Sequence, residues 1–89
     1  MVSCRVTIVN KLGLHARAAA KFVGCASAYG CRVRAGQGDR LVDGKSIMAV
    51  MMLAAGKGTV LTLEADGDDE EAALAALCTL IENRFDEDE

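Results

Sequence analysis

The sequence predicts a two-layer α+β fold with the element order βαββαβα, an open-faced sandwich in which a four-stranded antiparallel sheet carries three helices on one face. Two observations favour it. The predicted strands alternate apolar and polar residues, as in a sheet with one face in water, and the intervening segments show helical spacing. The chain has 89 residues, 52% of them hydrophobic, and a net charge of −3. This length supports one modest core, so residues 1–89 are predicted to form a single domain.

The first predicted strand and the first predicted helix flank a short loop. Apolar residues at every second position indicate the strand: Val2, Cys4, Val6 and Ile8. The alanine-rich segment 16–28 is predicted to be a helix that ends near Tyr29-Gly30. Its apolar residues at helical spacing are Ala16, Ala19, Ala20, Val23 and Ala26.

A hairpin and a second helix follow. The alternating residues 31–35 predict its first strand, the turn residues 36–39 its connection and residues 40–42 its second strand. Ser46 then suits the N-cap of a helix over residues 47–54.

The last predicted strand covers residues 59–65, which are rich in β-branched side chains. Acidic residues 68–71 favour the first turn of a C-terminal helix, because negative charge suits the positive end of the helix dipole. The predicted buried stripe of this helix is Leu74, Leu77, Cys78 and Ile81. The acidic ending, residues 86–89, is predicted to be frayed and solvated.

The four cysteines fall within apolar patterns and show no Cys-x-x-Cys spacing: Cys4, Cys25, Cys31 and Cys78. An even number of cysteines also permits two disulfides, or a metal or redox site. We predict buried free thiols, because an unpaired cysteine behaves as a small apolar residue.

His15 is the only histidine and lies where the first predicted helix begins. A helix N-terminus offers unpaired backbone N–H groups and the positive end of a dipole, and both favour a phosphate. The Arg17 guanidinium can add charge-assisted hydrogen bonds to the same group. Because a neutral imidazole is a nucleophile, these residues predict a phosphohistidine site. The alternatives are a surface or capping histidine without chemistry and a solvated arginine.

Spacing and composition exclude several other sites. Gly44-Lys45-Ser46 precedes a helix, but the position where a Walker motif needs its first glycine is Asp39. The acidic segment 66–70 lacks the spacing of a calcium loop. The acidic chain has few aromatic side chains for base stacking, so we expect no nucleic-acid partner.

The chain contains no apolar segment long enough to span a membrane, and no signal-peptide hydrophobic region follows Met1. We therefore expect a cytoplasmic protein that has no membrane partner.

Two motifs at matching spacing carry a resemblance to a known family. They are Leu12-Gly13-Leu14-His15-Ala16-Arg17 and Gly44-Lys45-Ser46-Ile47-Met48, the latter followed by Gly56-Lys57-Gly58-Thr59. With the order of elements, they make nearly the whole chain resemble HPr, the histidine-containing phosphocarrier family of the bacterial phosphotransferase system. The resemblance implies that His15 accepts a phosphoryl group, derived from phosphoenolpyruvate, from phosphorylated enzyme I and passes it to an enzyme IIA type acceptor. It implies a relay and not an enzyme, with no metal or other cofactor, and we expect a monomer.

One position departs from the family pattern. Many relatives carry proline where this chain has Ala18, in the first turn of the predicted helix. Alanine retains a backbone N–H that proline lacks, so the backbone of Ala16, Arg17 and Ala18 is expected to cradle the phosphate.

The second predicted helix carries the expected regulatory and docking residues. The resemblance implies phosphorylation of Ser46 by an HPr kinase in lineages that possess one, which would add charge at the start of this helix. The helix is apolar on every face, but a short helix that packs on an open sheet can bury only one of them. Ile47, Met48 and Met51 are therefore predicted to form an exposed docking surface for partners.

A second function from another class stays open. The chain can be a regulatory interaction module of a nitrogen-type or carbon-regulation phosphotransferase branch, without sugar-transport flux, in which Ser46 and the apolar surface matter more than phosphoryl transfer. The ending at residues 85–88 is similar to the nitrogen-branch paralogue, whereas the region around Ser46 is closer to the sugar-branch or kinase-regulated type.

Overall fold

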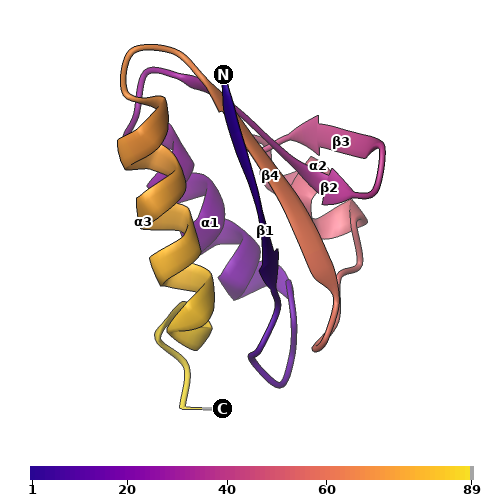
Figure 1. Ribbon diagram of the computed structural model, residues 1–89. Helices are drawn as coiled ribbons and strands as arrows, with labels where there is room; N and C mark the ends of the chain where they lie inside the picture. Colours follow the sequence, from indigo (N-terminus) through magenta and orange to yellow (C-terminus); the bar gives the residue numbers. More distant parts are fainter. Residues whose placement is uncertain (89) are drawn as a thin grey trace.

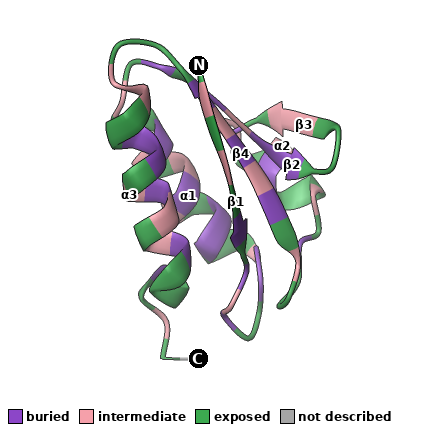
Figure 2. Cartoon of the chain, in the orientation of Figure 1, coloured by how far each residue is buried: buried purple, intermediate pink, exposed green. Residues whose placement is uncertain are grey.

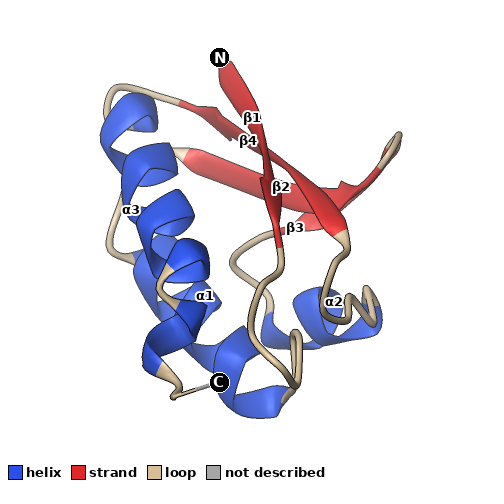
Figure 3. Ribbon diagram, turned by 60° about the horizontal axis from the view of Figure 1, so that its bottom comes forward, coloured by secondary structure: helices blue, strands red, loops and turns tan. Residues whose placement is uncertain are grey.

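In the computed structural model, which describes residues 1–88, seven elements follow the predicted order βαββαβα (Figure 1). They are β1 (Val2–Thr7), α1 (Ala16–Ser27), β2 (Arg32–Gln37), β3 (Arg40–Asp43), α2 (Ile47–Met52), β4 (Val60–Asp66) and α3 (Glu70–Glu82). The strands form one antiparallel sheet in the order β1-β4-β2-β3. The helices lie on one side of this sheet (Figure 3), so the predicted two-layer α+β fold is confirmed.

The register of the strands gathers the apolar residues on the face toward the helices. Cys4 and Val6 of β1 lie opposite Leu63 and Leu61 of β4, and Leu63 also lies opposite Ala35 of β2. Leu61, Leu63 and Ala35 are fully buried. The alternation along the strands is visible in Figure 2 and confirms the predicted one-sided sheet.

Helix α1 begins where predicted and ends one residue earlier, at Ser27, but it turns a different stripe toward the core. Ala16 and Ala20, which the spacing places in the stripe, are exposed. The buried residues are Ala18, Ala19, Phe22 and Ala26. Alanines occur on every face of this helix and do not indicate which face is buried. The largest apolar side chain, Phe22, therefore decides which face packs against the core. In α3 the predicted stripe is confirmed at Leu74, Leu77 and Ile81, whereas Cys78 is only partly buried.

Two predicted boundaries were wrong. Gln37 pairs with Arg40, so the hairpin turn is shorter than residues 36–39. Gly36 lies in β2, where a Cβ atom would sit 1.8 Å from the carbonyl oxygen of Arg40. Helix α2 ends before residue 54, because Ala54 adopts a left-handed φ of 51°.

The C-terminal segment contacts the protein at Glu87, which is partly buried and hydrogen-bonded, so the predicted frayed and solvated tail was wrong at this residue; Asp86 and Asp88 are exposed, and Glu89 lies outside the described residues. After α3 the chain makes a short turn, η1 (Arg84–Asp86), in which Phe85 is fully buried. The Nζ atom of Lys21 donates a hydrogen bond of 2.6 Å to the carbonyl of Phe85. The free energy gained by burying the Phe85 side chain outweighs the tendency of the neighbouring acidic residues to stay in water.

All four cysteines are free, but only Cys31 is buried. Cys4, Cys25 and Cys78 are partly exposed, which corrects the prediction that all four are buried. The Sγ atoms of Cys4 and Cys78 lie 3.2 Å apart, between β1 and α3. Burial, followed by the hydrogen bond to Cys4, raises the pKa of the Cys78 thiol to about 12.

Candidate functional site

His15 is the N-cap residue of α1, as predicted. Its backbone is extended (φ −71°, ψ 176°), and its carbonyl accepts the first hydrogen bond of the helix from the amide of Ala19 at 2.8 Å. The amides of residues 16–18 therefore precede the helical ladder, and within residues 1–88 they make no hydrogen bond. Three free donors and the positive end of the α1 dipole lie beside the imidazole.

A tight loop between β1 and α1 sets the position of His15. Gly13 has a left-handed φ of 67° and lies so close to the segment after α2 that a Cβ atom would be 2.4 Å from the carbonyl oxygen of Ala55. The amide of Leu14 donates to that same oxygen at 2.9 Å. The loop that presents His15 is thus held against the segment that follows α2, and α2 packs beside α1.

The imidazole also contacts the C-terminal segment. Nε2 of His15 makes a hydrogen bond with Oε2 of Glu87. The other carboxylate oxygen, Oε1, accepts a hydrogen bond of 3.0 Å from Nδ2 of Asn10. Asn10 is fully buried and also donates to the carbonyl of Gly13 at 2.9 Å. One side of the ring is therefore held, while Nδ1 makes no hydrogen bond within the described chain.

Charge around Glu87 keeps it ionised. Burial of the carboxyl raises the pKa of Glu87, but the hydrogen bonds from His15 and Asn10, together with the positive charge of Lys21, lower it by more. The net result is a pKa below the ordinary value for glutamate.

Arg17 lies with His15 on an open pocket of about 810 Å³. The pocket is lined by Lys11, Leu12, His15, Ala16, Arg17, Glu87 and Asp88. Arg17 is exposed, and within residues 1–88 its guanidinium has no ion-pair partner. It is therefore available to bind an anion delivered to His15.

Ala18 is fully buried, although its amide belongs to the first turn of α1. Its side chain packs in the core while the three amides of residues 16–18 start the helix in regular geometry. Alanine at this position therefore leaves the helix start intact and keeps a backbone donor that proline would lack.

Ser46 precedes α2, whose six residues span about 9 Å by the usual helical rise, whereas Ala55 follows the other end of the helix. As predicted, Ser46 is the N-cap, and its hydroxyl accepts a hydrogen bond of 3.2 Å from the amide of Ala49. Ser46 does not line the pocket of His15. The structure thus brings His15 and Arg17 together and leaves Ser46 on a neighbouring part of the surface.

Helix α2 consists mostly of exposed residues, drawn in green in Figure 2. Val50 is fully buried, whereas Ile47 is 44%, Met48 73% and Met51 40% exposed. Met52, which the sequence reasoning left out, is 79% exposed. We call Ile47, Met48, Met51 and Met52 the α2 patch.

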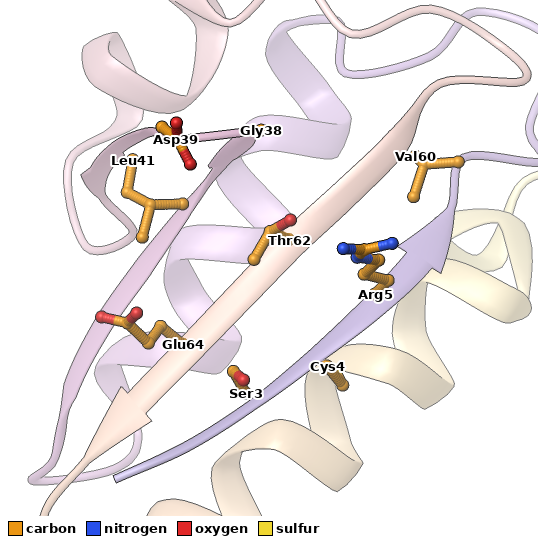
Figure 4. A pocket seen from close by; sticks show the side chains of 9 residues that line it. All are labelled: Ser3, Cys4, Arg5, Gly38, Asp39, Leu41, Val60, Thr62 and Glu64. Atoms are coloured by element: carbon orange, nitrogen blue, oxygen red, sulfur yellow. The ribbon is translucent and has the colours of Figure 1, made fainter.

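A second open depression, of about 820 Å³, lies on the outer face of the sheet (Figure 4). Its lining includes Arg5 from β1, Thr62 and Glu64 from β4, and Asp39 from the hairpin. Glu64 is engaged in an ion pair with Arg34. This depression contains no histidine and no helix N-terminus, so the His15 pocket is the better candidate for phosphoryl chemistry.

Two further features bear on function. Within residues 1–88, no group of three or more His, Cys, Asp or Glu side chains is arranged to hold a metal ion. None of the helices in the same part of the chain has the length and apolar character needed to cross a membrane.

Asn10 and Glu87 contact the site but were not predicted from the sequence. Asn10 follows an apolar strand pattern, and a polar residue there is usually a solvated turn residue. Glu87 lies within a run of acidic residues that is typical of a solvated tail. The only available signal was Phe85, a large apolar residue within that run, which indicates that the chain returns to the core.

Comparison with known proteins gives a consistent picture. Residues 2–83 match the family model described as the PTS HPr component phosphorylation site. The chain is 64% identical to the phosphocarrier protein HPr of Pseudomonas aeruginosa, with both chains covered completely. It is 43% identical to the phosphocarrier protein NPr of Shewanella violacea, over 93% of this chain and 91% of that one. Its fold matches the crystal structure of HPr-C-His from Thermoanaerobacter tengcongensis with a TM-score of 0.95 and 44% identity over the full length of both.

Proposed function

This chain belongs to the HPr family of phosphocarrier proteins of the phosphotransferase system, and we propose that His15 is the residue that carries the phosphoryl group. The donor is phosphorylated enzyme I and the acceptor an enzyme IIA type protein, both in the cytoplasm. One observation supports this most: on an open pocket, the imidazole of the N-cap residue lies beside three amides and an arginine that have no partner within residues 1–88.

The geometry favours Nδ1 as the attacking atom, because Nε2 is occupied by Glu87. The Nδ1 lone pair forms a bond to phosphorus while the bond from phosphorus to the donor residue breaks, and the bonding electrons leave with the donor. Phosphoryl transfer of this kind depends on positioning and on charge stabilisation of the phosphoryl oxygens. The amides of residues 16–18 and the Arg17 guanidinium supply both.

The openness of the pocket suits a relay. His15 is 27% exposed in its side chain, so a partner's active site can reach the ring from solvent. The same exposure lets the second partner collect the phosphoryl group. The chain then needs only to hold the group, and each partner contributes the rest of the machinery for its own step.

The α2 patch is the proposed docking surface for these partners. Exposed methionines form adaptable apolar contacts, which suits a protein that must bind a donor and several acceptors in turn. The contact of Gly13 with Ala55, in the segment that follows α2, joins this surface to the loop that presents His15.

Ser46 is the proposed site of control. A phosphate on its hydroxyl would add about two negative charges at the start of α2, directly beside the α2 patch. Helix starts tolerate such charge, so the effect is repulsion of a partner and not unfolding. We expect Ser46→Asp to lower the rate of transfer from enzyme I with the thermal midpoint nearly unchanged; an unchanged transfer rate contradicts the inhibitory role.

The test of the carrier function is phosphorylation by phosphoenolpyruvate and enzyme I. We expect one acid-labile, base-stable phosphate per chain, located on His15 by mass spectrometry, and none in His15→Ala. Arg17→Ala should slow transfer while leaving the free energy of unfolding within about 0.5 kcal/mol of the original protein, as is usual for exposed residues. A wild-type protein that binds enzyme I yet takes no phosphate would favour the regulatory interaction module instead.

A further inference from the structure

Cys4 and Cys78 form a pair of thiols that the proposed carrier function does not use. Cys4 lies in β1 and Cys78 in α3, 74 positions later, and their Sγ atoms are 3.2 Å apart. Neither residue lines the pocket of His15. We propose that this pair is an oxidation site, at which hydrogen peroxide converts the two thiols into a reversible disulfide that ties β1 to α3.

Regular secondary structure places the two sulfur atoms for bond formation. Cys4 is held by the pairing of β1 with β4, where it lies opposite Leu63, and Cys78 lies inside the helix α3, which packs against β1. The S–S distance of a disulfide is about 2.05 Å, so the two Sγ atoms must approach each other by about 1.1 Å. We expect rotation of the two side chains to supply this movement.

Both thiols are open to a small oxidant. Cys4 and Cys78 are partly exposed, whereas Cys31 is buried. Cys25 is partly exposed as well, but within residues 1–88 its thiol makes no hydrogen bond to a second sulfur. An oxidised sulfur at Cys4 therefore has a thiol beside it to react with, and one at Cys25 has none.

The protons decide which sulfur reacts first. Burial, followed by the hydrogen bond with Cys4, raises the pKa of the Cys78 thiol to about 12, and the negative charge of Glu82 acts in the same direction. Cys78 therefore keeps its proton and donates it toward the sulfur of Cys4. Because the nucleophile toward peroxide is a thiolate, Cys4 is the attacking residue and Cys78 the residue that closes the disulfide.

The reaction balances in two steps. The sulfur of Cys4, having released its proton, bonds to one oxygen of the peroxide while the O–O bond breaks; the leaving hydroxide takes up a proton, which gives a sulfenic acid and water. The sulfur of Cys78 then bonds to the sulfenic sulfur, the S–O bond breaks, and the hydroxyl group leaves as water with the proton of Cys78. Each sulfur loses one electron, and the two peroxide oxygens are reduced. A thiol reductant reverses the bond by exchange.

The disulfide protects the protein and leaves its surface chemistry in place. It consumes the sulfenic acid before a second peroxide converts it to sulfinic acid, which thiols do not reduce. It joins positions near the two ends of the chain, so it restricts most of the unfolded chain and stabilises the fold. Since β1 and α3 are already in contact and the pocket of His15 contains neither cysteine, the oxidised protein should still accept a phosphoryl group.

The experiment exposes the reduced full chain to hydrogen peroxide, removes the excess with catalase and blocks the remaining thiols under denaturing conditions. Mass spectrometry of the intact chain and of its peptides then locates the oxidised residues. Cys4→Ser and Cys78→Ser each remove one member of the pair. Cys25→Ser is the matched control, because it removes a partly exposed thiol that lies outside the pair. Thermal unfolding of the reduced samples confirms that each variant is folded.

We expect the original protein and Cys25→Ser to lose two hydrogen atoms, to yield a peptide that links residues 4 and 78, and to regain both thiols with dithiothreitol. The bond should raise Tm by at least about 10 °C in both proteins. In Cys78→Ser, Cys4 should stop at a sulfenic acid that dimedone traps. In Cys4→Ser, Cys78 should remain a thiol over the same period, because it keeps its proton.

The proposal is overturned if the original protein forms separate sulfinic acids at the two positions, if its disulfides join only different chains, or if the pair is oxidised no faster than Cys25. A bonded protein that has lost the transfer from phosphorylated enzyme I seen in the reduced protein overturns the protective role. The disulfide is detected without any phosphate, so a failure of the proposed carrier function would not be mistaken for a failure of this site.

Discussion

Gly13 is the residue at which backbone conformation, packing and function meet. Its φ of 67° lies in the left-handed region, and a Cβ atom would approach Ala55 O to 2.4 Å and Gly56 Cα to 2.8 Å. Gly38 is a natural control, because its φ of 61° is similar but a Cβ there meets nothing within 4 Å. Alanine at Gly38 therefore incurs only the conformational cost, whereas alanine at Gly13 incurs that cost and a clash with backbone.

The magnitudes follow from these two contributions. A left-handed alanine costs about 1 kcal/mol relative to glycine, so Gly38→Ala should lower the free energy of unfolding by about that amount. Gly13→Ala adds the displacement of the loop from Ala55, comparable to overpacking a core at about 1–3 kcal/mol. Its total should be about 2–4 kcal/mol. In a domain of this size each 1 kcal/mol lowers Tm by about 4–8 °C.

Urea unfolding followed by circular dichroism measures both variants, and phosphorylation by enzyme I is measured on the same samples. Because the loop carries His15, we expect Gly13→Ala to slow transfer even where the protein is fully folded, and Gly38→Ala to leave the transfer rate unchanged. The reasoning is refuted if the two substitutions lower stability equally, since the contact with Ala55 would then contribute nothing.

Three further predictions address other parts of the molecule. Met48→Asp should weaken binding to enzyme I in calorimetry without a matching loss of Tm, because Met48 is 73% exposed. If the variant binds enzyme I as tightly as the original protein, the α2 patch is not the docking surface. Alkylation of native Cys78 at neutral pH should be slow, because its pKa of about 12 leaves almost no thiolate, and rapid labelling would contradict this. Hydrogen bonds from the amides of Gly30 and Cys31 lower the pKa of Asp69 below its ordinary value, so its contribution to stability is present above about pH 4 and is lost as the pH falls through the lowered value. Asp69→Asn should therefore flatten the loss of stability on acidification, and an unchanged acid profile would contradict the role of these hydrogen bonds.

Local patterns in the sequence were sufficient for the order of the elements. The alternation in β1 and β4 and the N-caps at His15 and Ser46 depend on neighbours within a few residues, which is the range over which periodicity and capping act. The ends of β2 and α2 were less accessible. Strand β2 continues through Gly36 by pairing with β3, and α2 stops before Ala54, which adopts a left-handed φ without being a glycine, so neither end shows a turn signal at its own position.

The sequence by itself determined the sheet, the helices and the placement of His15 and Arg17 at the start of α1. Only the tertiary structure decided that Glu87 contacts His15, which lies 72 positions earlier, and that Asn10 joins them. The physical reason is that Glu87 follows Phe85, whose burial depends on a cavity made by distant elements. No local sequence pattern distinguishes an acidic residue in a solvated tail from one that a buried neighbour places against the imidazole of His15.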